Sequence, residues 1–487
     1  MGNGFEPLTP YDKIMVEDGL MNDEIKKNRT NPLGTEPVNQ LLFRFAIPSI
    51  IAMLVGSLYN IVDQFFIGNS VGELGNAATN ISFPLSISCV AIALLFGIGG
   101  ASAFNISMGR GEQKQAVYYL GNALVMLFGC GVILSVFTLL FLDSLLCFFG
   151  SPDNVLHYAR SYTGIVAWGF PFLIVTTGGG HLIRADGRPT ISMLCNLFGA
   201  VVNVFLDALF VSVLQMGMKG AAIATIVGQF LSGGMTLWFL SHCRTVTICL
   251  RHLKLQRAVL FRIVTLGMAP CSNQLAMMLV QIVMNKSLKY YGLHSVYGEA
   301  VPIACAGIIT KVNQVFMSFI IGISQGLQPI ISFNYGAKWY SRVKEAYQFA
   351  ITCGFVLALA AFSLFQFAPR QIISIFGNGS EEYYRFAINY FHIFLFCTFL
   401  NCLQPISSNF FTAIGKPKRG TFLSLTRQII FLLPLLVLIP IYAGIDGIMY
   451  AGPIADALAA AVTVIMVYRE FHREEYTNLK DRQDTLG

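Results

Sequence analysis

Two aspartates and one asparagine inside apolar segments are the residues best placed to do chemistry in this chain. Asp63 is the one carboxylate in the apolar run from Leu41 to Ile67. Asn203 and Asp207 stand four residues apart in a second apolar segment, so on a helix they point from one face. A carboxylate inside a membrane-spanning helix is costly and by default marks the path of an ion or a substrate. The pattern therefore predicts that Asp63 binds a proton or a cation in a transporter.

The two acids are expected at similar depths in the membrane. At about 1.5 Å per residue, Asp63 lies ~33 Å along its helix from Leu41, and Asp207 lies ~24 Å from Ile191. Two carboxylates close together and away from water cannot both ionise cheaply, so the pair would compete for one positive charge. The same oxygens would suit H⁺ or a small hard cation such as Na⁺. A second interpretation stays open, in which Asp63 is a helix-end residue at the outer water interface.

The elements that must position these acids are membrane-spanning helices. The 487 residues are 55% hydrophobic and 12% charged, with a mean hydropathy of +0.63, which is too apolar for soluble domains. The apolar runs are continuous, unlike the short alternating strands of a membrane β-barrel. We therefore expect an all-α membrane protein with twelve transmembrane helices, placed in the cytoplasmic (plasma or inner) membrane.

The predicted spans form two lobes of six helices. The N-lobe (39–241) and the C-lobe (257–468) are joined by a linker (242–256) and flanked by tails (1–38 and 469–487). The predicted spans are 41–67, 79–107, 116–141, 157–180, 190–213 and 220–241, then 257–285, 301–333, 344–369, 384–412, 420–443 and 446–468. Most Arg and Lys residues fall in the loops on the linker's side, which predicts that the linker and both termini are cytoplasmic.

The two halves resemble each other in sequence. FGIGGASAFNISMGRG (96–111) aligns with IGISQGLQPIISFNYG (321–336), and RADGRP (184–189) aligns with TAIGKP (412–417). Similar halves in the same orientation predict parallel repeats about a pseudo-two-fold axis along the membrane normal. The alignment places Asn285 opposite Asp63, and Phe431 and Leu435 opposite Asn203 and Asp207. At these positions the first half carries acidic groups and the second half carries none.

Several motifs together resemble those of the multidrug and toxic compound extrusion (MATE) family, over about residues 38–468. They are IPSIIAMLVGSLYNIVDQFFIGN, RADGRP, the NxxxD formed by Asn203 and Asp207, GAAIAT (220–225) and GISQGLQPIISFNYGA (322–337). The resemblance implies a bilobate fold of twelve helices that exports mostly cationic amphipathic compounds in exchange for H⁺ or Na⁺. It also implies an N-lobe cation site made of Asp63, Asn203, Asp207 and Thr225, with Tyr162 beside it.

The second lobe departs from family members that carry further acids there. Its seventh span offers amides instead, and we assign them to the substrate cavity: Gln274, Gln281 and Asn285.

Three further charges lie inside predicted spans of the C-lobe. Lys311 is deep in the eighth span, Asp456 is similarly deep in the twelfth and is its expected partner, and Arg427 is in the eleventh. We expect a structural role for these three residues, and Lys311 is left out of the binding set.

The sequence thus predicts an antiporter that exports organic cations or drugs by alternating access of two lobes. One alternative is a lipid-linked saccharide flippase of the same superfamily, and another is a membrane-embedded enzyme. No Walker motif, nucleophile–base set or metal motif occurs in the sequence, so we expect no enzymatic activity and no cofactor or metal beyond H⁺ or Na⁺ at the coupling site. The expected partners are small organic cations and membrane lipid, with no nucleic acid, and we expect a monomer.

Overall fold

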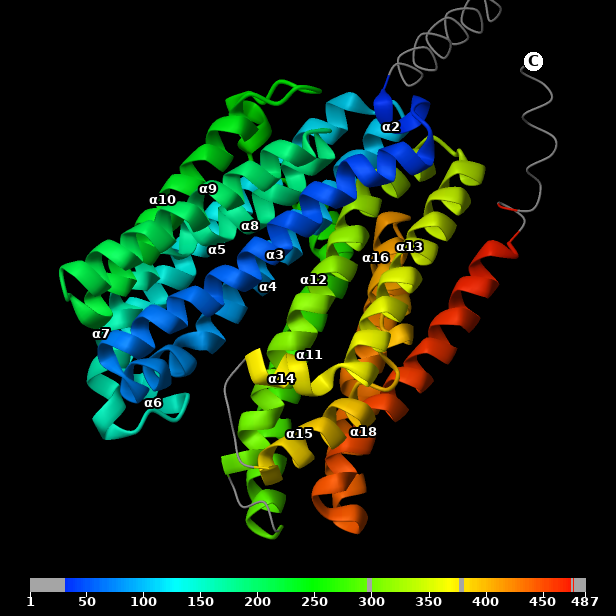
Figure 1. Cartoon of the computed structure of the whole chain (residues 1–487). Coiled ribbons are helices and arrows are strands. Elements are labelled where there is room, and N and C mark those ends of the chain that lie inside the picture. Colours follow the sequence, from blue (N-terminus) through cyan, green and yellow to red (C-terminus); the bar gives the residue numbers. More distant parts are fainter. Residues whose placement is uncertain (1–30, 296–299, 376–380, 474–475, 477–487) are drawn as a thin grey trace, which may run out of the picture.

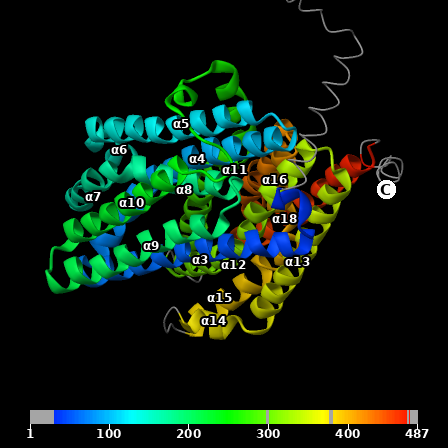
Figure 2. The same cartoon turned by 90° about the horizontal axis from the view of Figure 1, so that it is seen from above.

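The computed structural model describes residues 31–295, 300–375, 381–473 and 476. The predicted tails, 1–38 and 469–487, lie mostly outside these residues. The described residues form long helices joined by short turns and arranged as two lobes (Figures 1 and 2). α2, the linker and the last turns of α18 lie at one end of the molecule, which we name the linker end; the opposite end is the far end.

The N-lobe comprises the helices that precede the linker. They are α2 (Pro32–Thr35), α3 (Val38–Val71), α4 (Glu73–Gly109), α5 (Gln113–Leu140), α6 (Leu142–Phe148), α7 (Asp153–Val166), η1 (Ala167–Gly169), α8 (Phe170–Ala185), α9 (Pro189–Asp207), η2 (Ala208–Val213) and α10 (Gly217–Ser241). The linker carries one short helix, η3 (Leu250–Leu253).

The C-lobe comprises the helices that follow the linker. They are α11 (Arg257–Leu293), α12 (Ala300–Gly336), α13 (Tyr340–Phe367), α14 (Pro369–Ile375), α15 (Glu381–Phe394), η4 (Thr398–Leu400), α16 (Leu403–Ala413), α17 (Pro417–Leu425), η5 (Thr426–Leu432) and α18 (Leu433–Phe471).

The long apolar segments account for the twelve predicted spans. Eleven described segments are long and apolar enough to cross a membrane, and the last, Pro417–Phe471, has 55 residues. At ~1.5 Å per residue that segment is ~80 Å long, which is enough for two crossings. Gly444 breaks it with a φ of 60°, between the predicted eleventh and twelfth spans. The predicted all-α membrane fold is therefore confirmed.

The repeated RADGRP and TAIGKP motifs form the same turn in both lobes. Gly187 and Gly415 end the preceding helices with φ of 83° and 73°, a conformation that favours glycine. Pro189 and Pro417 then occupy the first turn of the next helix. The backbone N–H groups of a first turn have no partner within the helix, so a proline there costs no hydrogen bond. Each motif thus reverses the chain at the linker end.

The lobes pack against each other near the linker end, through a contact that we name the seam, in which α3 and α4 meet α11 and α12. Four glycines let the backbones approach closely: a Cβ atom on Gly99 would lie 2.1 Å from the Ile263 carbonyl oxygen, and one on Gly267 would lie 1.8 Å from that of Leu95. Gly109 and Gly336 make the equivalent approach between α4 and α12. Figure 1 shows α3 and α12 separating toward the far end.

Polar side chains join the lobes across the seam. Gln328 of α12 donates hydrogen bonds to the Ile98 carbonyl oxygen at 3.2 Å and to the Ser102 hydroxyl at 2.9 Å. Farther from the linker end, the hydroxyls of Ser57 and Ser318 lie 2.9 Å apart. The linker end is therefore closed between the lobes in this conformation.

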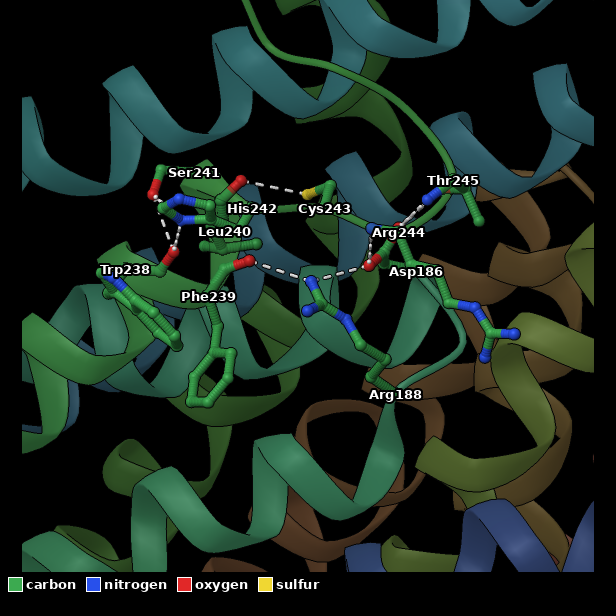
Figure 3. Close-up of polar contacts among 10 residues, drawn as sticks. All are labelled: Asp186, Arg188, Trp238, Phe239, Leu240, Ser241, His242, Cys243, Arg244 and Thr245. Carbon is green, nitrogen blue, oxygen red and sulfur yellow. Dashed lines mark hydrogen bonds and ion pairs between the residues drawn. The ribbon is translucent and has the colours of Figure 1, made fainter.

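The start of the linker is fixed to the N-lobe by Asp186, a fully buried carboxylate (Figure 3). It accepts hydrogen bonds from the backbone N–H groups of Arg244 and Thr245, both at 2.9 Å, and from the Thr245 hydroxyl at 2.6 Å. Arg188 pairs with the same carboxylate at 2.7 Å and donates to the Phe239 carbonyl oxygen at 2.9 Å. Asp186 thus joins the turn after α8 to the chain leaving α10.

The end of the linker is fixed to the N-lobe by Asn122 of α5. Its amide nitrogen donates to the carbonyl oxygens of His252 and Lys254, both at 3.1 Å, and its oxygen accepts from the Gln256 N–H at 2.8 Å. The fully buried Asn122 therefore holds the linker up to the residue before α11.

Candidate functional site

The residues predicted for the cation site gather inside the N-lobe, in its half nearer the far end. α3 supplies Asp63, α9 supplies Asn203 and Asp207, α10 supplies Thr225, and α7 supplies Tyr162. The first four side chains are between 0% and 7% exposed. The two carboxylates lie close enough to interact electrostatically, and Tyr162 approaches both Asp63 and Thr225. Asp63 is buried against the N-lobe, so the interpretation as an exposed helix-end residue is wrong.

Small residues bring α9 against α10 beside these side chains. A Cβ atom on Gly228 would lie 2.8 Å from the Gly199 carbonyl oxygen and 3.1 Å from the Asn203 Cβ. This close packing lets the Asn203 amide donate to the Thr225 hydroxyl at 3.5 Å. The Gly199–Gly228 contact therefore sets the separation of the two helices at the site.

α9 changes its winding at Asp207. The α-helix ends there and continues as a π-helix, η2 (Ala208–Val213). Short π-helical segments are rare and often occur at functional sites, because the wider turn re-aims the neighbouring side chains. Asp207 thus sits where the helix geometry is least regular.

Four oxygens of the site lack hydrogen-bond donors among the described residues. Asp63 Oδ1, Asn203 Oδ1 and both carboxylate oxygens of Asp207 are buried and accept no hydrogen bond from any described residue. No described Lys or Arg forms an ion pair with either acid. A buried acceptor without a donor costs about 1–3 kcal/mol, and more when it is charged. A proton or a hard cation bound among these oxygens would remove that cost.

Tyr59 belongs to the same cluster and was missed in the sequence. It lies one helical turn before Asp63 on α3, and it interacts with both carboxylates and with the Thr225 hydroxyl. The signal that could have revealed it is its spacing, four residues before Asp63, which places both side chains on one helix face. Tyr59 and Tyr162 therefore both present hydroxyls to the site.

The predicted cavity amides of the C-lobe lie on one face of α11. Gln274, Gln281 and Asn285 follow Gly267 by seven, fourteen and eighteen residues, which is close to a whole number of turns in each case. Gln281 donates to the Asn285 side chain at 3.0 Å. The face that packs on α4 at the seam thus continues toward the far end as a row of amides.

The predicted pairing of Lys311 with Asp456 is wrong. Asp456 of α18 pairs with Arg427 of η5 at 2.5 Å, so these two charges form a buried tie within the C-lobe. Lys311 is exposed and has no ion-pair partner among the described residues. The reason is rotational: Arg427 and Asp456 face each other from neighbouring helices, and Lys311 faces elsewhere.

A family model and two relatives from known bacteria match most of the helical region. A family model described as MatE matches residues 48–209 and 272–438. The multidrug export protein MepA of Staphylococcus haemolyticus (strain JCSC1435) is 23% identical over 428 residues, covering 88% of this chain and 92% of that protein. MepA of Staphylococcus aureus (strain MSSA476) is 21% identical over 434 residues, covering 89% and 94%.

Solved structures of the same kind share the fold. A multidrug resistance MATE transporter of the MOP superfamily in its outward-facing conformation superposes with a TM-score of 0.83 at 22% identity, covering 92% of this chain and 97% of that one. The MATE multidrug transporter DinF-BH, solved in complex with a dye, gives a TM-score of 0.83 at 31% identity, covering 91% and 98%.

Proposed function

Since the chain belongs to the MatE family of multidrug efflux transporters, we propose that it is an antiporter, which exchanges small organic cations for H⁺ or Na⁺ bound at Asp63 and Asp207. The observation that carries this proposal is the pair of buried carboxylates that form no ion pair with any described Lys or Arg. Two acids in a poorly hydrated site favour the uptake of one positive charge, which is the requirement for coupling. Asn203, Thr225, Tyr59 and Tyr162 supply the remaining oxygens.

The closed seam supports an outward-facing interpretation of this conformation. The linker end is assigned to the cytoplasm because its loops carry most of the basic residues. In the proposed cycle an ion from outside binds at Asp63 and Asp207, substrate leaves, and the lobes rock so that the seam opens toward the cytoplasm. The proposed ion site lies wholly in the N-lobe. Ion binding would therefore drive the exchange by changing the conformation of the N-lobe.

The proposed cargo follows from the relatives and from the amide row of α11. The relatives are named for multidrug export, and DinF-BH was solved with a bound dye. Gln274, Gln281 and Asn285 would line the substrate path in the C-lobe. The acidic groups of the N-lobe favour this cargo over the lipid-linked saccharides of the flippase alternative, and both the family and the fold favour a transporter over an enzyme.

Purified protein in vesicles tests the proposal. Ethidium efflux is measured under an imposed pH gradient, an imposed Na⁺ gradient, or neither, for the wild type, Asp63→Asn and Asp207→Asn. We expect one gradient to drive efflux by the wild type and neither gradient to drive it in the two variants. Asp446→Asn removes an exposed carboxylate of α18 and serves as the matched control. Gradient-driven efflux that survives in Asp63→Asn and Asp207→Asn would overturn the assignment of the site.

A further inference from the structure

Lys311 is a cation inside a transmembrane segment that the proposed coupling site does not use. It lies in the apolar segment Cys305–Gly336 of α12, its side chain is exposed, and no described carboxylate pairs with it. A lysine at such a depth is expensive in contact with lipid, so it is expected to face polar surroundings and a specific ligand.

The contacts of α12 establish which way Lys311 points. Ser318, Gly322 and Gln325 touch α3 of the other lobe, through the Ser57 hydroxyl, the Ile50 backbone and the Met53 sulfur respectively. Lys311 precedes Ser318 by seven residues, about two helical turns, so it lies on the same face. It therefore points toward the N-lobe, just beyond the contact between the Ser57 and Ser318 hydroxyls.

The facing surface of α3 is polar at the same level. Ser57 and Ser318 touch, which gives the two helices a common reference level. Gln64 follows Ser57 by seven residues, so Gln64 and Lys311 both lie ~10 Å beyond that contact on facing sides. Asn60 on α3 and Gln314 on α12 are exposed between these levels.

The lipid-facing side of α3 has the opposite character. Leu58 and Phe65 are 53% and 64% exposed, and both are apolar, as contact with lipid requires. The exposed Asn60 lies about 160° around the helix from Leu58, away from that side. Polar exposure at this level of α3 is thus on the side that faces the other lobe.

We propose that Lys311 and Gln314 of α12, opposite Asn60 and Gln64 of α3, bind the carboxylate of a transported molecule. The ammonium group supplies a charge-assisted hydrogen bond and the amides supply further donors. This inference rests on the proposed function and refines its substrate class: the favoured cargo is a zwitterion, with an acidic group for Lys311, over a compound that carries only positive charge. A purely cationic compound would leave the ammonium without a partner and so bind less tightly than the zwitterion.

A matched pair of dyes tests the proposal. A xanthene dye is used as its free carboxylic acid, a zwitterion, and as its methyl ester, a cation, so that the two differ at one group. Binding to the purified full chain in detergent is measured by fluorescence anisotropy, with no ion gradient. For Lys311→Met we expect a loss of about tenfold or more in affinity for the acid form, and none for the ester. Lys311→Arg should keep the preference, and Lys286→Met, which removes an exposed lysine of α11, should not change it.

Equal effects of Lys311→Met on the acid and the ester, or no effect on either, would overturn the proposal. If Lys311→Met does not fold, Gln314→Leu and Gln64→Leu test the proposal instead, because they keep the charge of Lys311. Both variants should lower the affinity for the acid form of the dye and leave that for the ester unchanged. An unchanged affinity for the acid form would overturn the proposal. Because binding is measured without a gradient, this result is independent of coupling. A preference that depends on Lys311, together with efflux in vesicles that needs no gradient, would reject the proposed antiport and keep the subsite.

Discussion

Adding one methyl group at Gly267 should open the closed end of the transporter. A Cβ atom there would lie 1.8 Å from the Leu95 carbonyl oxygen, whereas carbon and oxygen in contact stay ~3.3 Å apart or more. α4 and α11 must therefore separate by ~1.5 Å in Gly267→Ala, or the backbone must bend to relieve the clash. The backbone oxygen cannot rotate away as a flexible side chain could.

The size of the effect follows from the cost of overpacking. Extra methyl groups in a well-packed interface cost about 1–3 kcal/mol. This penalty acts only while the seam is closed, so Gly267→Ala should shift the equilibrium toward seam-open states by about 5- to 150-fold. Hydrogen–deuterium exchange measured by mass spectrometry should rise by a corresponding factor in the seam segments 95–109 and 261–270.

Two controls make the test specific. Gly129→Ala and Gly307→Ala also add a methyl group within a helix, but at these positions it would meet nothing within 4 Å. They should leave exchange at the seam unchanged, and exchange in the middle of α5 should stay at the wild-type level in Gly267→Ala. Unchanged exchange at the seam in Gly267→Ala, or an equal rise in the controls, would refute this reasoning.

Three further outcomes are expected. Gly228→Ala, whose new Cβ would meet a carbonyl oxygen of α9 at 2.8 Å, should part α9 from α10 and slow ion-driven efflux in vesicles; wild-type efflux would contradict this. Arg427→Met should cost about 3–5 kcal/mol by leaving Asp456 buried without its partner, and adding Asp456→Leu should recover most of that loss, as thermal unfolding in detergent would reveal. Burial, with a neighbouring carboxylate, raises the pKa of Cys243 to about 12, so at pH 8 its thiol stays protonated and iodoacetamide should label it more slowly than the exposed Cys249, as read by mass spectrometry; equal rates would contradict the burial of Cys243.

The fold was largely predictable because its dominant signals are local. Apolar runs of membrane-spanning length are visible in composition alone, and a glycine followed by a proline two residues later marks the turns at Gly187 and Gly415. Gly444 lies between the predicted eleventh and twelfth spans and divides the last long segment without a proline two residues later. Such features act within a few residues, so they can be seen without knowing which helices are neighbours.

The N-lobe site was predictable in part for a different reason. Asp63 and Asp207 stand out because charge is rare in apolar spans, and Asn203 shares a helix face with Asp207. The family resemblance supplied Thr225 and Tyr162. Tyr59 carries no such signal, because tyrosines are common in this chain and only the helix face shared with Asp63 distinguishes it.

Partners across distant spans could not be predicted. Whether Asp456 meets Lys311 or Arg427 depends on how each helix is rotated about its axis, which depth along the membrane does not encode. The seam glycines were equally hidden, since a Cβ atom on Gly267 would meet the backbone of a neighbouring helix and one on Gly129 would meet nothing within 4 Å.

The anchoring of the linker limits how the two lobes can travel. A flexible linker would let one lobe translate or tilt freely relative to the other. Here Asp186 and Asn122 hold the connection down as far as Gln256, one residue before α11 begins. The covalent connection between the lobes is thus reduced to the single step from the anchored Gln256 to the start of α11. Such a joint permits a swing about that point and little else, so the seam should part and close again in the same register on every turnover.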